Sequence, residues 1–529
     1  MERKKLPIGI QDFQDFHNEN YLYIDKTEWV YQLLTQGKNY FLARPRRFGK
    51  SLLLSTIKEV FQGRKALFEG LWIENKWDWT KTHPVVHLSL GAIGFKEIGL
   101  SRSLHSVLNT CAAEHGITLT EDSNPLRFRE LLEKVHTKSG KVAVLIDEYD
   151  KPIVDCLNDI PQANANRDIL HDFYIVLKDN PQFLHFIFIT GISKFSKVSI
   201  FSALSHLSDI SMKYDYATML GYTQQELESS FKPYMPQAMK RLNLTEEQLL
   251  SQLKFWYNGY SWDGKTKVYN PFSIINFFDH CEFKNFWFST GTPSFLTILA
   301  RQQQFYDMDS IETAESAFDT FDVENLNAQA IMFQTGYLTI KKHDIATQRY
   351  TLGYPNHEVR KAFLTFMIEA YSFTQVNNAA PWAIRLEKAF FQRNLKEVMS
   401  LMNTMFANIP SYIFDKDSEK YYHSLMHLLL HYLGTFVQSE VNTSDGRIDS
   451  VIHTPNHIYV MEYKLNKTAQ EALNYIYKQQ YLIPYLHTEK ELIAVGIGFS
   501  SETKKISEWK EKVIVKRVNP RTVSIKKIK

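Results

Sequence analysis

The sequence predicts a multidomain α/β protein with a parallel sheet near its N-terminus, a helical or winged-helix-like middle and a second α/β domain at its C-terminus. Three observations carry this prediction. Over residues 39–63 a buried-type strand, a loop and an amphipathic helix follow one another, which is the order of a parallel α/β unit. A continuous apolar run, Val142–Ile146, reads as a strand buried on both faces. Near the C-terminus, two short β-type runs flank the turn residues HTPNH and should pair as a hairpin.

The composition is that of a folded protein with more than one core. The chain has 529 residues, of which 44% are hydrophobic and 22% charged. No apolar segment follows the basic start and no run of about 18 apolar residues occurs, so we expect a cytoplasmic protein without a membrane partner. The three cysteines follow no C-x-x-C spacing, which predicts buried thiols. Ten Lys and Arg against three Glu gather in residues 501–529, either as a solvated face or as phosphate contacts.

The stretch RPRRFGKS ends like a phosphate-binding loop but does not begin like one. Such a loop reads G-x-x-x-x-G-K-[ST], and here Arg44 and Pro45 stand at its first two positions. The strand NYFLA precedes the loop, and the helix after it stops at Gly63, which favours a nucleotide site over a chance tripeptide. We expect Lys50 to contact the β- and γ-phosphates and Ser51 to bind Mg²⁺. Other residues expected to contact the nucleotide are Arg46, Arg47 and Gly49.

A partner motif follows in KVAVLIDEYDKP, where the apolar strand ends in Asp147 and Glu148. At the carboxyl end of a buried parallel strand, an aspartate can hold Mg²⁺ through water and a glutamate can polarise the attacking water. A third strand in FLHFIFITG ends at Thr190, and we expect Thr190 or Ser193 to sense the γ-phosphate. The alternatives are a core strand with an incidentally acidic end and a threonine that only terminates a strand.

Seven patches, in order from Leu6 to about Ser273, resemble the AAA-ATPase-like family of prokaryotic proteins. They are LPIGIQDF, YIDKT, RPRRFGKSL, LIDEYDKP, ITGISKFSKVSIFS, YNGYSW and VYNPFS. The resemblance implies a P-loop ATPase that uses ATP and Mg²⁺. It also implies that Arg44 and Pro45 are the family's usual form of the loop, whose first turn must then follow a different backbone path from a glycine-containing one.

The sequence of the middle of the chain predicts secondary structure and domain limits but no catalytic or ligand-binding residues. The aromatic-rich segment 216–300 is expected to form a helical lid whose aromatic residues pack together, with the helix TQQELESSF opening on a Thr cap. From Ile331 the order helix end, strand, turn, strand, helix outlines a winged-helix module, and a structural connector is the alternative. The resulting domain limits are 1–215, 216–300, 301–400 and 401–529.

A second constellation lies in SEVNTSDGRIDSVIHTPNHIYVMEYKLNK. Asp449 stands early in the first strand of the expected hairpin, and Glu462 and Lys464, two apart, point to one face of the second strand. Carboxylate oxygens suit Mg²⁺, which lowers the pKa of a bound water, while a lysine can orient that water or steady the developing charge. The alternative is an exposed hairpin with incidental charges.

This spacing resembles the PD-(D/E)XK nuclease superfamily, with GRID as the first motif and EYK as the second. The resemblance covers residues 418–500. It implies that Asp449 and Glu462 are metal ligands, that Glu440 on a preceding helix is an additional acid, and that Lys464 is catalytic.

One position departs from the superfamily pattern. The helix AQEALNYIYKQQYLIPY should carry a Gln inside the site, and Tyr475 occupies that place. Gln479 or Gln480 would then substitute for it, while Tyr481 matches the later tyrosine of the pattern.

The function expected from both sites is ATP binding and hydrolysis coupled to Mg²⁺-dependent cleavage of nucleic acid, DNA or RNA, with a homo-oligomer left open. The alternative is a nucleotide-switched interaction protein whose nuclease-like domain binds nucleic acid without cutting it.

Overall fold

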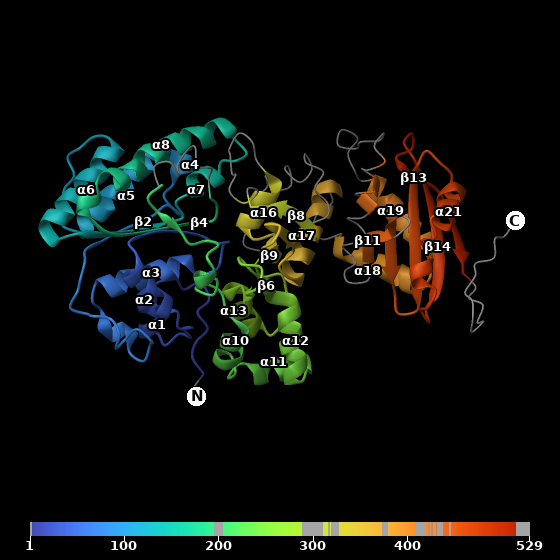
Figure 1. Cartoon of the computed structure of the whole chain (residues 1–529), viewed down its shortest axis with the longest axis horizontal. Coiled ribbons are helices and arrows are strands. Elements are labelled where there is room, and N and C mark those ends of the chain that lie inside the picture. The colour runs from blue at the N-terminus through green and yellow to red at the C-terminus, as the bar shows by residue number, and fades with distance from the viewer. Residues whose placement is uncertain are drawn as a thin grey trace. The chain divides into compact units, whose positions relative to one another are not determined.

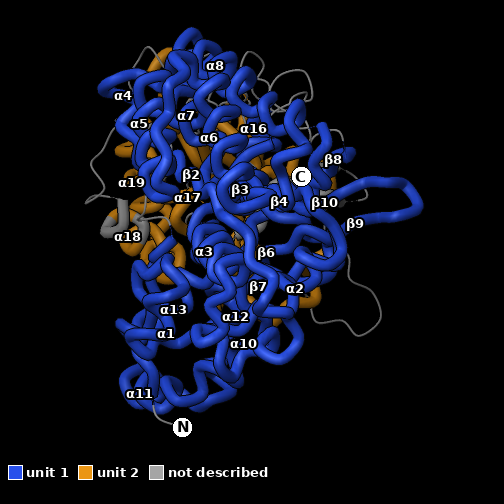
Figure 2. The backbone as a smooth tube through the Cα atoms, turned by 90° about the vertical axis from the view of Figure 1, so that its left-hand side faces the viewer, with its two compact units in different colours: residues 1–360 blue, residues 361–529 orange. Residues whose placement is uncertain are grey.

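The computed structural model divides the chain into two compact units, residues 1–360 and 361–529, which Figure 2 colours separately. The domain limits drawn from the sequence are finer than this division and stay a prediction. The structure describes residues 3–194, 205–287, 310–315, 318, 327–372, 379–407, 419, 422–423, 425–426, 430, 437–443 and 446–514.

The first unit is built on a five-stranded parallel sheet of order β2-β3-β4-β1-β5. Its strands are β1 (Asn39–Ala43), β2 (Val85–Ser89), β3 (Val142–Asp147), β4 (Leu184–Gly191) and β5 (Ser208–Asp209). β3 is buried throughout, as its continuous apolar run predicts. Because β4 lies between β1 and β3, the loop after β1, the acids after β3 and Thr190 on β4 meet at one carboxyl edge of the sheet.

Helices cover both faces of this sheet (Figure 1). On one face lie α1 (Phe13–Asn18), α2 (Thr27–Gln36) and α3 (Lys50–Phe61). On the other lie α4 (Phe95–Ile98), α5 (Leu100–Glu114), α6 (Asn124–Ser139), α7 (Lys151–Val154) and α8 (Ile160–Asp179). α3 buries Leu53, Ile57 and Val60, the apolar side chains whose helical spacing predicted this helix.

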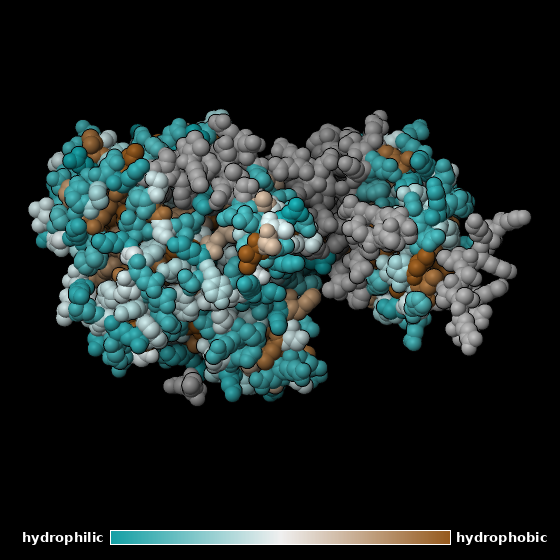
Figure 3. Space-filling model, in the orientation of Figure 1, coloured by the Kyte–Doolittle hydropathy of each residue, from teal (hydrophilic) through white to brown (hydrophobic). Residues whose placement is uncertain are grey.

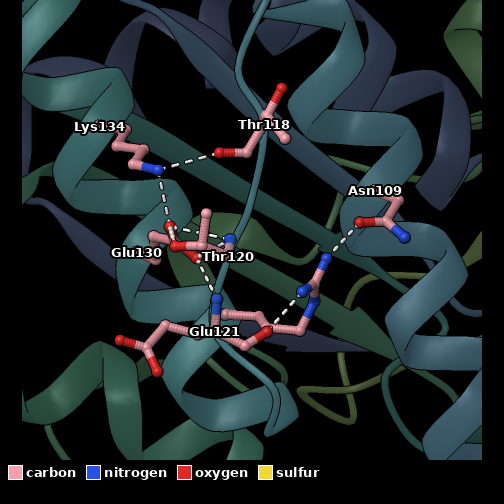
Figure 4. Close-up of polar contacts among 7 residues, drawn as sticks. Asn109, Thr118, Thr120, Glu121, Glu130 and Lys134 are labelled. Carbon is pink, nitrogen blue, oxygen red and sulfur yellow. Dashed lines mark hydrogen bonds and ion pairs between the residues drawn. The ribbon is translucent and has the colours of Figure 1, made fainter.

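A polar cluster fixes the connection between α5 and α6 (Figure 4). The Glu130 carboxylate accepts hydrogen bonds from the backbone N–H groups of Thr120 (2.8 Å) and Glu121 (3.0 Å) and from the Thr120 hydroxyl (2.7 Å). The Lys134 ammonium donates to the same carboxylate at 2.6 Å and to the Thr118 carbonyl at 2.9 Å. Burial alone raises the pKa of Glu130, but these donors outweigh burial and bring the pKa down to about 2.

Replacing Glu130 by alanine should lower the free energy of unfolding at pH 7 by about 1–2 kcal/mol, because two backbone N–H groups lose their acceptor. Since the folded-state pKa lies below its ordinary value of 4.5, this stabilisation is present above pH 4.5 and is lost as the pH falls toward 2. Urea unfolding at pH 7 and at about pH 3 should therefore show a smaller gap between wild type and variant in acid. Glu133→Ala, at an exposed position on the same helix, is the control. A gap of equal size at both pH values would contradict this account.

The segment after the sheet forms a small helical subdomain. Its elements are α10 (Gln224–Ser230), α11 (Met235–Leu242), α12 (Glu246–Tyr257), β6 (Asn258–Tyr260), β7 (Val268–Tyr269) and α13 (Pro271–His280). Thr223 caps α10 through a capping box, as predicted. The aromatic side chains pack into one core, in which the rings of Phe231 and Phe278 stack with centroids 4.9 Å apart. The prediction that they pack together is confirmed, and the role of a lid stays a prediction.

A three-stranded antiparallel sheet of order β8-β10-β9 completes the first unit. The elements around it are β8 (Ile311–Ala314), α16 (Ala328–Thr335), β9 (Thr339–Asp344), β10 (Arg349–Gly353) and the start of α17 (His357–Ser372), which continues past residue 360 into the second unit. The order helix, strand, turn, strand, helix predicted from Ile331 onward is confirmed. The interpretation of this order as a winged-helix module and the alternative of a structural connector both stay predictions.

The second unit is a five-stranded sheet of order β11-β12-β13-β14-β15, in which β13 and β14 are parallel and the other neighbours antiparallel. Its strands are β11 (Val437–Thr443), β12 (Gly446–His453), β13 (His457–Leu465), β14 (Glu491–Ser500) and β15 (Lys505–Val513). Its longer helices are α18 (Ala379–Phe391), α19 (Leu395–Ala407) and α21 (Ala469–Lys478). β12 and β13 form the predicted hairpin, and α21 packs against β13 and β14.

The expectation that Glu440 lies on a helix is wrong. Glu440 belongs to β11, which pairs antiparallel with β12. The segment VQSEVNT is rich in β-branched residues, which favour a strand, and its pairing with β12 extends the sheet. The side chain of Glu440 lies outside the described residues, so its role as an additional acid stays a prediction.

The surface seen in Figure 3 is mostly hydrophilic on each unit, with apolar side chains in small scattered groups. Within the described ranges, no helix is both long and apolar enough to span a bilayer. Cys111, Cys156 and Cys281 are buried free thiols, as predicted.

Candidate functional sites

The loop RPRRFGKS turns between β1 and α3 through two residues with left-handed backbone, Arg47 (φ 68°) and Gly49 (φ 92°). Gly49 is the N-cap of α3, so the first N–H groups of that helix have no partner within the helix and are available to an anion. The buried Lys50 ammonium donates to the backbone carbonyls of Arg44 (2.9 Å) and Pro45 (3.0 Å). Burial lowers the pKa of Lys50, against the pull of the nearby carboxylates.

Arg44, at the position of the missing glycine, is an internal anchor. Its side chain is buried and its guanidinium donates to the carbonyls of Ala43 (3.0 Å), Ser211 and Tyr216 (3.5 Å). The same group lies over the Trp262 ring, 3.9 Å from the centroid. Burial lowers the pKa of Arg44 to about 9. The left-handed turn of the loop therefore falls at Arg47 and Gly49 instead of at its first residue. The buried Arg44 side chain fixes the first residue of the loop to the core.

The two remaining arginines of the loop lie toward solvent. The Arg46 guanidinium pairs with Asp155 at 3.6 Å and is partly exposed. The guanidinium of Arg47 lies over the Phe272 ring, 4.9 Å from its centroid. Both arginines line the cavity described below, so both charges border the space in front of the loop.

The acids after β3 lie at the same edge of the sheet. Asp147 is buried, and its Oδ1 accepts hydrogen bonds from the Thr190 hydroxyl (2.7 Å) and the Glu148 N–H (3.0 Å). Glu148 has a left-handed backbone (φ 52°), and its carboxylate lies 3.3 Å from the Lys151 ammonium at the edge of the cavity. The Ser193 hydroxyl instead donates to the buried Asp150 carboxylate. Of the two residues considered as γ-phosphate sensors, Thr190 is the one linked to Asp147.

A cavity of about 410 Å³ opens in front of the loop. It is large enough for a nucleotide-sized ligand. At one end it is bordered by Arg46 to Leu53 and by Glu148. Thr56 and Lys151 also line it, and the rest of its wall comes from four separate segments, whose lining residues are Pro7, Gly9, Ile10, Gln11, Phe16, Leu22, Tyr23, Ile24, Lys26, Met219, Leu220, Gly221, Tyr222, Pro271, Phe272 and Ile275.

This wall was missed by reasoning from the sequence. The patches LPIGIQDF, YIDKT and VYNPFS contribute to it, but their mostly apolar side chains carry no chemical signature and lie far apart in the chain. The only signal for this wall in the sequence was the family resemblance, because the same patches accompany the phosphate-binding loop in the AAA-ATPase-like pattern.

In the second unit, the hairpin brings the predicted side chains together. The Lys464 ammonium donates to Glu462 Oε1 at 2.8 Å, and the Tyr463 N–H donates to Asp449 Oδ2 at 2.8 Å. Glu462 is 2% exposed, and its Oε2 is buried with no hydrogen-bond partner among the described residues. Burial and the neighbouring Asp449 raise the pKa of Glu462 to about 8. Burial also raises the pKa of Asp449. Two crowded carboxylates with an unused oxygen favour a cation between them.

Two further polar side chains reach this site. His423 Nδ1 lies 3.4 Å from Asp449 Oδ1, and Glu419 Oε1 lies 3.9 Å from the Lys464 ammonium. The two residues are four apart at helical positions, and their side chains lie 3.8 Å from each other. An E-x-x-x-H spacing before the sheet was the signal that could have found them. No three His, Cys, Asp or Glu side chains within the described part of the chain are already grouped tightly enough to hold an ion.

Tyr475 borders the same site, and the substitution of the pattern's Gln by Gln479 or Gln480 stays a prediction. The Lys464 ammonium lies 4.6 Å from the centroid of the Tyr475 ring. Gln479 is the C-cap of α21 and Gln480 follows it, so both lie at the end of the helix. Tyr481 is buried, with its ring centroid 6.1 Å from that of Tyr475.

These features define a P-loop nucleotide-binding fold, with an added strand between the loop strand and the acidic strand, joined to a mixed-sheet nuclease-superfamily fold. Residues 7–201 match the AAA-ATPase-like family, described as "Predicted AAA-ATPase", and residues 417–509 match the PD-(D/E)XK nuclease superfamily. The chain is 35% identical over 519 residues to an uncharacterized protein of the vnfD 5′ region of Azotobacter chroococcum mcd 1, covering 96% of this chain and 98% of that protein. The chain belongs to the AAA-ATPase-like family and carries a C-terminal PD-(D/E)XK nuclease-superfamily domain.

Two solved structures align weakly. The Aeropyrum pernix ORC2 protein, in ADPNP and ADP complexes, aligns with 12% identity and a TM-score of 0.26 over 66% of this chain and 94% of its own. The Aeropyrum pernix ORC1 protein in complex with DNA aligns with 10% identity and a TM-score of 0.23 over 64% and 90%.

Proposed function

We propose that this protein binds and hydrolyses ATP in the first unit and couples that cycle to Mg²⁺-dependent cleavage of nucleic acid in the second. The observation that carries the nuclease part is the packing of Asp449, Glu462 and Lys464 on one hairpin, with a buried carboxylate oxygen left without a partner. The substrate is a phosphodiester of DNA or RNA, and a homo-oligomer is compatible with the proposal.

In the nucleotide site, the N–H groups at the start of α3 and the Lys50 ammonium receive the phosphates. Lys50 must then exchange its contacts with the loop carbonyls for contacts with the β- and γ-phosphates. The Ser51 hydroxyl and Asp147 would hold Mg²⁺, which when bound neutralises charge developing on the phosphates. Thr190 holds the Asp147 carboxylate in place, and Glu148 orients the attacking water.

In the nuclease site, Asp449 and Glu462 would hold Mg²⁺, which when bound polarises a phosphoryl oxygen and lowers the pKa of a water. Lys464, held at 2.8 Å from Glu462, steadies the water whose oxygen bonds to phosphorus as the bond to the bridging oxygen breaks. Its positive charge also offsets the negative charge that develops on the phosphoryl oxygens.

Lys50→Ala should weaken ATP binding by about 10–100-fold, because charge-assisted hydrogen bonds to the phosphates are lost. Calorimetry on the purified full chain measures the affinity. Lys58→Ala, on the same helix, is the matched control and should bind ATP like wild type. Equal ATP affinities for wild type and Lys50→Ala would contradict the proposal that Lys50 binds the phosphates of ATP.

Glu148→Gln should keep ATP bound but slow its hydrolysis by about 10²-fold or more, the scale of a lost general base. The amide retains the shape of the side chain but cannot take a proton from water. Phosphate release under single-turnover conditions is the measurement, with ATP affinity as the control for intact binding. Turnover equal to that of wild type would show that Glu148 has no part in the reaction.

The presence of Tyr475 where the superfamily pattern has Gln favours a second candidate function. In it, nucleotide binding switches a nuclease-like domain that binds nucleic acid without cutting it. Under that reading, wild type with Mg²⁺ binds DNA or RNA with an affinity that depends on ATP and cleaves neither.

A further inference from the structure

Lys464 has three neighbours that attract a positive charge. Its ammonium donates to Glu462 Oε1 at 2.8 Å, lies 3.9 Å from Glu419 Oε1 and lies 4.6 Å from the centroid of the Tyr475 ring. The side chain is 20% exposed. A lysine carries a compact charge at the end of a flexible four-carbon chain. The position of its ammonium therefore depends on the groups that surround it. The two carboxylates and the face of the ring each attract the ammonium.

The Tyr475 ring is held by a rigid element. α21 begins at a complete capping box formed by Thr468 and Glu471, and its face toward the sheet buries Ala472, Leu473 and Ile476. The ring itself packs against the same core and lies edge-on to Tyr481 at an interplanar angle of 73°. Because the helix is fixed to β13 and β14, the ring faces Lys464 from a fixed position.

We infer that Tyr475 is the positioning residue of Lys464, acting through the face of its ring and replacing the amide that the superfamily pattern places there. The inference rests on the proposed nuclease function. An aromatic face attracts a cation without accepting one of its N–H protons in a directed hydrogen bond. The ammonium is thus held by Glu462 and by the ring together, while its remaining protons stay free for a water or a phosphoryl oxygen. Tyr475 does not need to touch the substrate in this role.

The same helix supplies a matched comparison. Tyr477 is also partly buried, packs against the same core and has a lysine ammonium, that of Lys512, 5.8 Å from its ring centroid. Its cation partner lies on β15 and is not part of the D…ExK constellation. Removing the Tyr477 ring therefore tests for loss of packing in α21 without disturbing Lys464.

The experiment compares Tyr475→Phe, Tyr475→Leu and Tyr477→Leu with wild type in the full chain. The first readout is the acylation rate of the Lys464 amine at fixed pH, followed by peptide mass spectrometry and divided by that of the exposed Lys467. The second is the single-turnover rate of Mg²⁺-dependent nucleic-acid cleavage. Circular dichroism checks that all four proteins are folded.

We expect Tyr475→Phe and Tyr477→Leu to match wild type within about twofold in both readouts. Tyr475→Leu should raise the relative acylation rate of Lys464, because the ring no longer holds the amine, and should lower the cleavage rate, each by about tenfold. A relative acylation rate of Lys464 in Tyr475→Leu equal to that in wild type would overturn the inference. So would a Phe variant that behaves like the Leu variant, because the hydroxyl and not the ring would then be the active group. If wild type cleaves nothing, the proposed nuclease function fails, while the acylation rates still decide the role of Tyr475.

Discussion

Replacing Arg44 by glycine, which restores the usual first residue of a phosphate-binding loop, is expected to destabilise the protein by about 3–5 kcal/mol. The change removes a large buried side chain and leaves the carbonyls of Ala43, Ser211 and Tyr216 without their donor. It also removes the guanidinium that lies over Trp262. Urea unfolding of the full chain, followed by the fluorescence of its tryptophans, measures the change.

Two variants make this test specific. Arg44→Lys keeps the charge but cannot span three carbonyls, so it should lose most of the same stability. Arg47→Ala, at an exposed position of the same loop, should change stability by less than about 0.5 kcal/mol. An Arg44→Gly protein as stable as wild type, with tighter nucleotide binding, would mean that Arg44 is a defect of the loop and not an anchor.

The second large effect is expected at the nuclease site, where Glu462→Gln should reduce cleavage by at least about 10³-fold. The amide keeps the shape of the buried side chain but removes the charge that would hold the metal. ATP affinity should not change, because Lys50 lies in the other unit. Nucleic-acid binding should persist and weaken as salt rises, since phosphate contacts do not need the metal.

The measurement is a cleavage time course with Mg²⁺, together with ATP calorimetry and a salt titration of binding. Glu502→Ala, which removes an exposed acid of the same unit, is the control and should cleave like wild type. Undiminished cleavage by Glu462→Gln would exclude this carboxylate as a metal ligand.

Much of the fold follows from local patterns in the sequence. The apolar run VAVLID predicts a strand buried on both faces, and the helix after Gly49 has its apolar residues at helical spacing. The hairpin of β12 and β13 was predictable because turn residues separate two β-type runs. The prediction that Glu440 lies on a helix was wrong because the apolar residues of its segment follow no clear periodicity. Its strand conformation comes from pairing with β12.

The parts of the sites that escaped prediction depend on contacts between distant segments. The wall of the nucleotide cavity joins Gln11, Lys26, Leu220 and Phe272, whose proximity no local spacing encodes. The sequence shows that Arg44 stands in place of a glycine, but its role as an anchor could not be predicted because its burial depends on distant segments. The motif EYK predicts the pairing of Glu462 and Lys464 by alternation along a strand, but their contacts with Glu419 and Tyr475 arise only from packing.

The most direct test of the proposed function is a cleavage assay on purified wild-type protein with single-stranded DNA, double-stranded DNA and RNA. Each substrate is incubated with Mg²⁺ or Mn²⁺, with and without ATP, beside samples containing EDTA and beside Glu462→Gln. We expect wild type to cut at least one substrate, ATP to change the rate, and EDTA or the Glu462→Gln change to stop the reaction. Wild-type protein that binds these nucleic acids but cuts none of them under any condition would contradict the proposed function.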